Sequence, residues 1–425
     1  MKLVAIGLIA MMPFWVFGQG SLQPPGAPGP VMRSLDQLEP RIPITNVPMT
    51  IQVPGVYYFT GNLTCSVAGT QGIHIVTSDV VIDLNGFCLT GPGSTSLDGI
   101  VQAFGISNAT VRGGTLKSWS GTGARAVSLW GANNRVEKVN VLSCASGINC
   151  GDGALVTGCQ VQDGVAVTYF YGLSVGNGSI VRDCIVRNCH APSSFLRAIR
   201  VGAGSVLSDC TVSYCTSAES FTGIDGGYGS TLERCAVFDG RSSGSSSIYG
   251  IYLNQGAQVA KAAVNYLYGN GSTAYGIYAE AGAAVKDCVV NVVSNGGGTA
   301  VGVYAAYDGR VEGNTIRDSS YDGIVVNQNC QVLNNNCSRN GTYVTGGGLV
   351  CQGQGNNLQG NSSSGNGYGI FSSDSGNIIA RNSARDNTVN DYQLNALDTY
   401  GPIVSISGNF TNTTAASHPW ANFSY

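Results

Sequence analysis

Short alternations of apolar and polar residues dominate the chain, whereas an amphipathic helix would carry apolar residues at every third or fourth position. Within residues 172–301, five segments align on one another: YGLSVGNGSIVRDCIV, RAIRVGAGSVLSDCTV, TGIDGGYGSTLERCAV, YGIYLNQGAQVAKAAV and YGIYAEAGAAVKDCVV. They recur about every 26 residues, a period typical of stacked structural repeats. The alternating runs are short and end at Gly, Asn or Ser, which predicts short β-strands.

Two columns of equivalent residues show how far the repeat extends. The first column contains Cys159, Cys184, Cys210, Cys235, Ala262, Cys288, Asn314, Asn335, Asn361 and Asn382. The second column lies five residues further along and contains Gly164, Cys189, Cys215, Gly240, Leu267, Val293, Ser319, Asn340, Asn366 and Asn387. Strands that return to the same phase in every coil, without hairpin turns between them, predict a parallel β-solenoid. In such a fold each coil buries its inward side chains against the coils above and below.

The repeat phase also predicts how the chain is divided. Coils are expected to begin near Gly72, Gly99, Ala126, Gly147, Gly172, Ala198, Gly223, Gly250, Gly276, Gly302, Gly323, Gly348 and Gly369, about thirteen in all. We therefore expect the solenoid over residues 72–392, a Pro/Gly-rich leader and N-terminal cap over 21–71, and a C-terminal cap or tail over 393–425. Residues 1–20 combine Lys2 with a short apolar run, which predicts a secretory signal peptide. The protein is thus expected to be secreted or held at the cell surface.

Composition narrows the range of functions. Glycine supplies 61 of 425 residues, about twice the average usage, which suits a chain that must turn tightly in every coil. Charged residues make up only 11% and the net charge is −3, so no basic surface for nucleic acid is predicted. The three histidines do not predict a metal site. Beyond the signal segment, no stretch is long and apolar enough to predict a membrane span.

Fourteen cysteines in an exported chain first suggest disulfides. Cys159, Cys184, Cys210 and Cys235, however, are spaced by whole coils, as small buried residues in a ladder would be. The same column then changes to Ala262 and to asparagines, which is typical of a packing position. Buried free thiols are therefore favoured over disulfides, although neighbouring coils are close enough for a bridge.

Three stretches of sequence carry a resemblance to a known family. They are PGVYYFTGNL at 54–63, VVIDLNGFCLTG at 80–91, and the coils that continue to Asn382. Together they resemble the right-handed parallel β-helix repeat proteins of the pectate-lyase-like superfamily, and the HPWANFSY tail is similar to that of secreted, uncharacterised bacterial members. The resemblance covers about residues 45–425 and implies a single-stranded right-handed parallel β-helix, an all-β fold. The superfamily includes polysaccharide lyases, hydrolases, epimerases, carbohydrate binders and adhesins, so it leaves the function open.

The resemblance also indicates which residues an enzyme would use. A lyase would show a calcium-binding acidic cluster with an Arg or Lys base, and a hydrolase would show paired carboxylates. The best match is Asp183 and Asp209, which are expected to be neighbours on adjacent coils, with Arg187 nearby as a base. These three are the catalytic candidates. Arg234 and Lys261 continue the column of the two aspartates, however, and alternating charges are more typical of a solvated surface than of an acid–base site.

Tyrosines give a second candidate site. In the Gly-x-Tyr triplets at 250–252, 276–278 and 302–304, the middle residue is expected to point inward and the tyrosine outward. Tyr252, Tyr278 and Tyr304 are therefore predicted to form an exposed stack, which Arg200 and Asp225 continue as an ion pair. Aromatic rings suit contact with sugar rings, so the three tyrosines are candidate carbohydrate-binding residues. The alternative is cross-strand packing that only stabilises the sheet.

The sequence as a whole favours an exported β-helix that binds polysaccharide or belongs to a surface or matrix, without predicted catalysis. A polysaccharide lyase or glycoside hydrolase is the first alternative, and a purely structural adhesion module is the second. No cofactor is predicted, except calcium if the chain is a lyase. The expected partner is a polysaccharide, and the sequence carries no pattern that sets an oligomeric state.

Overall fold

The computed structural model describes residues 41–341, 346–405 and 415–425. The predicted signal peptide and the residues up to 40 lie outside this range. The chain divides into two units, Met1–Arg41 and Ile42–Tyr425, and all strands from β2 onward belong to the second unit. The described residues contain no helix that is long and apolar enough to cross a lipid bilayer.

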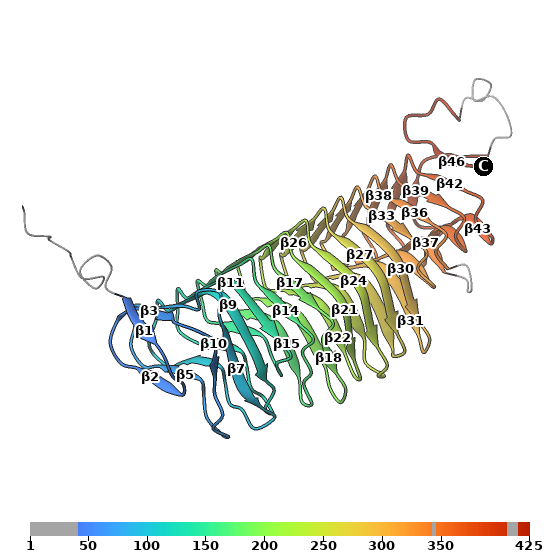
Figure 1. Cartoon of the computed structure of the whole chain (residues 1–425). Helices are drawn as coiled ribbons and strands as arrows, with labels where there is room; N and C mark the ends of the chain where they lie inside the picture. Colours follow the sequence, from blue (N-terminus) through green and yellow to red (C-terminus); the bar gives the residue numbers. More distant parts are fainter. Residues whose placement is uncertain (1–40, 342–345, 406–414) are drawn as a thin grey trace, which may run out of the picture. The chain divides into compact units, whose positions relative to one another are not determined.

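The second unit is a right-handed parallel β-helix (Figure 1). Its strands form two parallel sheets of 15 and 31 strands, in which neighbours in space come from successive coils. A central coil supplies one strand to the smaller sheet and then two strands to the larger sheet before the chain rises to the next coil. The predicted fold class, and the resemblance to β-helix repeat proteins at the level of the fold, are confirmed.

The smaller sheet contains β2 (Met49–Ile51), β5 (Ile73–Ile75), β8 (Ile100–Gln102), β10 (Val127–Leu129), β12 (Ile148–Cys150), β15 (Phe170–Val175), β19 (Leu196–Val201), β22 (Phe221–Gly226), β25 (Ile248–Leu253), β28 (Thr273–Ala279), β31 (Thr299–Tyr307), β34 (Asp322–Gln328), β37 (Gly347–Cys351), β40 (Tyr368–Ser372) and β43 (Asn390–Gln393). The larger sheet contains β1 (Arg41–Ile44), β3 (Gly55–Phe59), β4 (Leu63–Thr64), β6 (Val80–Asp83), β7 (Cys88–Gly93), β9 (Thr110–Trp119), β11 (Arg135–Leu142), β13 (Leu155–Thr157), β14 (Gln160–Gln162), β16 (Ile180–Arg182), β17 (Ile185–Arg187), β18 (His190–Ala191), β20 (Val206–Ser208), β21 (Thr211–Ser217), β23 (Thr231–Glu233), β24 (Ala236–Ser242), β26 (Gln258–Ala260), β27 (Ala263–Gly269), β29 (Ala284–Lys286), β30 (Val289–Asn295), β32 (Arg310–Glu312), β33 (Thr315–Arg317), β35 (Gln331–Leu333), β36 (Asn336–Ser338), β38 (Asn357–Gln359), β39 (Ser362–Ser364), β41 (Ile378–Ala380), β42 (Ser383–Arg385), β44 (Thr399–Tyr400), β45 (Ile403–Ser405) and β46 (Asn422–Ser424).

The predicted coil starts fall at successive strands of the smaller sheet. The thirteen residues from Gly72 to Gly369 lie at or beside the strands from β5 to β40. The same sheet has one further strand at each end, β2 and β43. In the predicted C-terminal tail, β46 pairs with β42 and so extends the larger sheet.

Tight bends separate the strands of each coil. Between residues 148 and 322, each coil has three residues with positive φ; in the coil of β22–β24 they are Gly229, Arg234 and Asp239, with φ of 60°, 52° and 52°. The two columns recognised in the sequence are the residues that directly follow the second and third bends. A column that follows the first bend was not recognised; it contains Ser179, Ser205, Ser230, Ala257 and Ala283.

Apolar ladders fill the interior. Ile224, Ile251, Ile277 and Val303 occupy equivalent positions in consecutive strands of the smaller sheet and are at most 1% exposed. Glycine begins many coils because two backbones approach closely there. At Gly250, a Cβ atom would lie 2.5 Å from the carbonyl oxygen of the next coil and 2.6 Å from a valine methyl group, so a larger residue would force the coils apart.

All fourteen cysteines are free thiols, and thirteen of them are buried. Many of them donate their weak S–H to the backbone; Cys184 Sγ, for example, lies 3.2 Å from the carbonyl oxygen of Arg182. Burial raises the pKa of the Cys150 thiol to about 12, because a thiolate is poorly solvated in an apolar interior. The thiols therefore pack as small apolar groups, as the sequence favoured.

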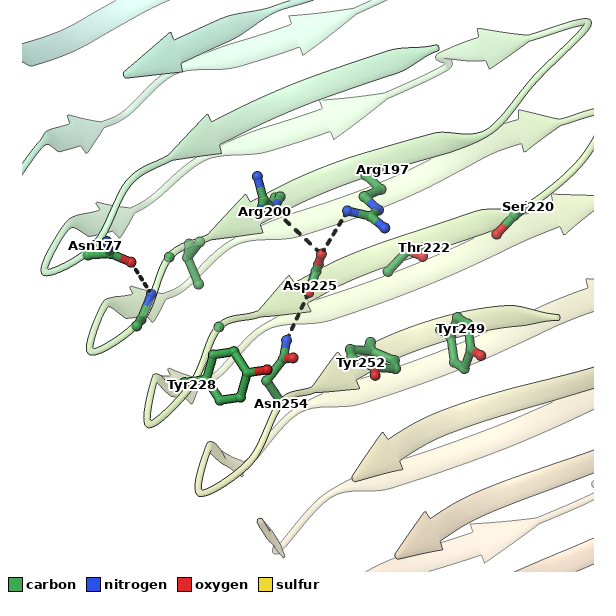
Figure 2. Close-up of a pocket in the computed structure, with 14 residues that line it drawn as sticks. Asn177, Arg197, Arg200, Ser220, Thr222, Asp225, Tyr228, Tyr249, Tyr252 and Asn254 are labelled. Carbon is green, nitrogen blue, oxygen red and sulfur yellow. Dashed lines mark hydrogen bonds and ion pairs between the residues drawn. The ribbon is translucent and has the colours of Figure 1, made fainter. Parts of the chain in front are cut away.

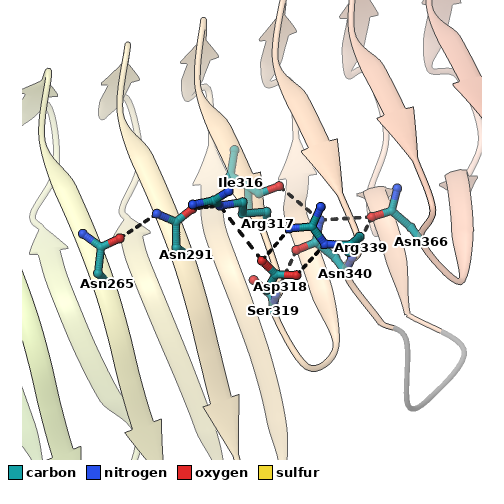
Figure 3. Close-up of polar contacts among 9 residues, drawn as sticks. All are labelled: Asn265, Asn291, Ile316, Arg317, Asp318, Ser319, Arg339, Asn340 and Asn366. Carbon is teal, nitrogen blue, oxygen red and sulfur yellow. Dashed lines mark hydrogen bonds and ion pairs between the residues drawn. The ribbon is translucent and has the colours of Figure 1, made fainter.

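Buried asparagines replace cysteine in the later coils and form a hydrogen-bonded ladder. Asn361 Oδ1 accepts from the backbone N–H and the Nδ2 of Asn335, at 2.9 and 3.0 Å. Asn361 in turn donates from Nδ2 to the carbonyl oxygen of Val332 at 2.8 Å. Figure 3 shows the parallel ladder, in which Asn340 contacts Asn366 in the same way. Each amide thus satisfies buried groups of the adjacent coil.

We expect Asn361→Ala to destabilise the β-helix by about 2–4 kcal/mol, because the buried backbone N–H of Asn335 loses its partner and the Asn335 amide and the Val332 carbonyl each lose a hydrogen bond. Cys210→Ala at the equivalent position removes only a thiol, and we expect it to cost about 1 kcal/mol. Equilibrium unfolding in urea measures both. Equal effects of the two substitutions would contradict the role of the asparagine ladder.

The Asp322 carboxylate is buried on the outer face of the smaller sheet. Asp322 lies in register with Val301, which packs with Val325 and Val350 in a small apolar cluster. Its Oδ1 accepts the backbone N–H of Gly347 at 2.7 Å. Burial raises the pKa of Asp322 from 3.8 to about 6, because desolvation disfavours the charged form more than this single hydrogen bond favours it.

The folded state therefore holds a proton on Asp322 between pH 4 and 6 that the unfolded state has released, so stability should fall as the pH rises through this window. Asp322→Asn keeps the acceptor and removes the charge. We expect the variant to be more stable than the parent by up to about 3 kcal/mol at pH 8 and equally stable near pH 4. Urea unfolding at the two pH values measures this; a difference that does not change with pH would contradict it.

Candidate functional site

The three catalytic candidates lie on the side of the larger sheet, where Asp209 and Arg187 make side-chain contacts with neighbouring coils. Asp183 and Asp209 are bend residues with φ of 56° and 55°, a conformation that aspartate tolerates better than most residues. Asp209 accepts from Arg234 Nε and Nη2 at 2.6 and 2.9 Å, and this contact lowers the pKa of Asp209. Arg187 donates from Nε and Nη2 to Gln162 Oε1 at 2.9 and 2.6 Å.

Asp183 and Asp209 follow paired residues of adjacent coils, as predicted, but within the described residues no hydrogen bond or ion pair joins the three side chains to one another. Asp209 is stabilised as a carboxylate by a guanidinium, which disfavours a role as general acid. Glu233 contacts both Arg234 and Lys261, so opposite charges are paired on this surface, although the column itself places Asp183 beside Asp209 and Arg234 beside Lys261. Within the described residues, no three His, Cys, Asp or Glu side chains are grouped as a metal site. A catalytic role for Asp183, Asp209 and Arg187 stays a prediction.

The predicted tyrosine stack lies on the outer face of the smaller sheet. Tyr252 and Tyr278 are in register, as are Tyr278 and Tyr304. Their rings are nearly parallel, with centroids 5.2 and 5.0 Å apart. The residues between Gly and Tyr point inward, as predicted. The rings are half-buried, since within the column each ring faces the next.

A second tyrosine column runs beside the first. Tyr249 and Tyr275 are in register, with parallel rings 5.5 Å apart. Each ring also meets the first column edge-to-face, for instance Tyr249 against Tyr252 at 5.1 Å and 81°. Parallel and edge-to-face contacts are both favourable for aromatic rings. This column was missed in the sequence, although its 26-residue spacing is visible there.

Both tyrosine columns end at β22, and a groove begins there. The residues in register with Tyr249 and Tyr252 on that strand are Thr222 and Asp225, which are shorter. On the next strand, β19, the same positions carry Arg197 and Arg200. The cavity is about 600 Å³ in volume. It has tyrosine rings on one side and guanidinium groups on the other, with the threonine and the aspartate between them (Figure 2).

Asp225 holds the guanidinium groups over the groove. Its Oδ2 lies 3.4 Å from Arg197 Nη1 and 3.8 Å from Arg200 Nε, while Asn254 Nδ2 lies 3.4 Å from Oδ1. The predicted Arg200–Asp225 pair is therefore present, and Arg197 is an additional partner. Burial raises the pKa of Asp225, against the opposing effect of both arginines. The arginine side chains are 40% and 50% exposed, and a guanidinium has five N–H donors, so donors still face the groove.

The tyrosine hydroxyls bordering the groove stay protonated at neutral pH. Burial raises the pKa of Tyr249. Burial and the neighbouring Glu280 carboxylate raise the pKa of Tyr252 as well, and its hydroxyl donates to Glu280 Oε1 at 2.5 Å. The groove thus offers aromatic ring surface, hydrogen-bond donors and two positive charges against one negative charge.

No family model matches the chain, and no curated protein matches its sequence. Among solved structures, the A-module of the mannuronan C-5 epimerase AlgE6 of Azotobacter vinelandii is 10% identical, with a TM-score of 0.32 over 88% of this chain and 91% of that one. The AlgE4 A-module of the same organism is 13% identical, with a TM-score of 0.29 over 84% and 91%. The surface protein and adhesin PfbA of Streptococcus pneumoniae is 10% identical, with a TM-score of 0.23 over 91% of each chain. This similarity does not assign an activity to the chain.

Proposed function

We propose that this chain is an exported polysaccharide-binding protein, secreted or held at the cell surface, and that the groove between β19 and β25 binds an acidic sugar of the polymer. The observation that carries the proposal is the position of two guanidinium groups opposite the ends of two tyrosine columns. Export is supported by the predicted signal peptide at residues 1–20.

The spacing of the coils suits a sugar ring. Strands β19 and β25 are separated by one intervening strand, so their backbones are about 10 Å apart. The side chains on that strand, Thr222 and Asp225, are shorter than the tyrosines and arginines on either side. A pyranose ring in this space would place C–H groups against Tyr249 or Tyr252, whose faces on this side are not covered by another ring of the column.

Charge selects the kind of sugar. The groove is lined by Arg197 and Arg200 and by one carboxylate, Asp225, so the lining has an excess of one positive charge. A carboxylate or sulfate on the sugar would accept charge-assisted hydrogen bonds from the guanidinium groups, which are stronger than bonds between neutral groups. A neutral sugar would gain only the ring contact. We therefore favour an acidic polysaccharide as the partner.

Retardation in native gels containing polygalacturonate or alginate tests this proposal. We expect both polymers, or one of them, to retard the protein, and added salt to weaken the effect. Arg197→Gln combined with Arg200→Gln should lower the affinity at least tenfold, because a charged hydrogen-bonding pair is lost. Arg310→Gln, an exposed arginine paired with Glu312 on the larger sheet, is the matched control and should bind normally.

Two tyrosine variants extend the same experiment. Tyr252→Ala removes a ring at the end of a column and should weaken binding, whereas Tyr278→Ala removes an interior ring and should affect binding less. Normal binding by both the double arginine variant and Tyr252→Ala would overturn the proposal and leave the structural role of the tyrosines. New reducing ends or unsaturated uronates would instead favour the lyase or hydrolase alternative and direct attention to Asp183 and Asp209.

A further inference from the structure

The groove is longer along the strands than across them. Its lining follows β22 from Ser220, just before the strand, to Tyr228, just after it, and Figure 2 shows these two residues at opposite ends of the lining. At about 3.3 Å per residue, the distance between them is up to about 26 Å. Across the coils the lining extends from Asn177 to Asn254, which is three strand spacings, or about 14 Å. The groove is therefore elongated crosswise to the direction in which the coils stack.

Taller side chains border β22 on both sides. On the β25 side, the rings of Tyr249 and Tyr252 are the ends of two columns whose rings stack 5.5 and 5.2 Å apart. On the β19 side the border consists of Arg197 and Arg200, and the two β22 side chains between these borders are at most 9% exposed. A ligand that lies along β22 keeps contact with both borders, whereas one that crosses the coils toward β28 would have to pass over the tyrosine columns.

Tyr228 stands at one end of the groove and is 59% exposed. Its equivalent in the preceding coil is Ala203, a short side chain that also lines the groove. Asn177 lies at the same end, and its Oδ1 accepts the backbone N–H of Ala203 at 2.8 Å. The side-chain N–H groups of Asn177 therefore remain donors for a sugar hydroxyl. This end offers a ring and an amide beyond the reach of the two tyrosine columns.

We propose that the groove binds a linear segment of several sugars lying along β22, and that Tyr228 is an additional binding residue at one end of the segment. The inference rests on the proposed function, in which an acidic sugar on the two arginines occupies the middle of the groove. Asp225 and Tyr228 are three residues apart, which is up to about 10 Å. The sugar against Tyr228 is therefore a different unit of the polymer from the one at the arginines. The partner is recognised as a chain, and a single uronate would use only the middle of the site.

Isothermal titration calorimetry with oligogalacturonates and oligomannuronates, from the dimer to the octamer, tests the inference. We expect the affinity of one series to rise from the dimer and to level off by about the pentamer or hexamer, because longer chains extend beyond the groove. Tyr228→Ala should lower the affinity for the pentamer at least about threefold and leave that for the dimer unchanged. Tyr307→Ala is the matched control, since Tyr307 is 45% exposed at the equivalent bend three coils further on, outside the groove. Neither substitution of an exposed ring should shift the midpoint of thermal unfolding.

Failure of the inference is distinguishable from failure of the proposed function. If no oligomer and neither polymer binds, both are wrong. Two results would keep the proposed function and overturn the lengthwise segment: an affinity that already levels off at the dimer, or unchanged pentamer binding by Tyr228→Ala while the double arginine variant loses it. An affinity that keeps rising to the octamer would also overturn it, and would direct the chain across the coils over Ser174, which is in register with Arg200.

Discussion

In-register hydrogen bonding between successive coils is the constraint on which the rest of the structure depends. It stacks each residue on its equivalents one strand spacing away, so a side chain mainly contacts the same position in the neighbouring coils. Apolar residues, thiols, amides and aromatic rings all stack favourably on their own kind. Like charges do not, whereas the opposite charges of Asp209 and Arg234 on adjacent coils form an ion pair. The interior ladders and the outer columns are two consequences of one geometry.

In such a structure, a groove can form where the residue type of an outer column changes from one coil to the next. A uniform tyrosine column covers its own ring faces and offers a partner only edges and hydroxyls. At β22 the column changes to Thr222 and Asp225, and at β19 to arginines, so a ring face, a depression and positive charge occur together.

The spacing of the repeats in the sequence predicted the features that the register between coils determines. These are the coil starts, the inward columns, the Tyr252–Tyr278–Tyr304 stack and the Arg200–Asp225 pair. It did not predict what depends on side-chain conformation and on several coils at once. The face-to-face packing of the tyrosines, the second column at Tyr249 and Tyr275, and the groove itself belong to this class. The left-handed conformation at Asp183 and Asp209 also needed coordinates, because a bend is local and changes no period. The sequence spacing of these two aspartates suggested a catalytic pair. The left-handed bend gives a structural reason for aspartate at both positions.

The measurement that tests the account most directly is a crystal structure of the chain with a short polygalacturonate oligosaccharide. We expect a sugar ring in the groove, one face against Tyr249 or Tyr252 and its carboxylate within hydrogen-bond distance of Arg197 or Arg200. An oligosaccharide ordered at the Asp183–Asp209 surface, with solvent alone in the groove, would contradict the account.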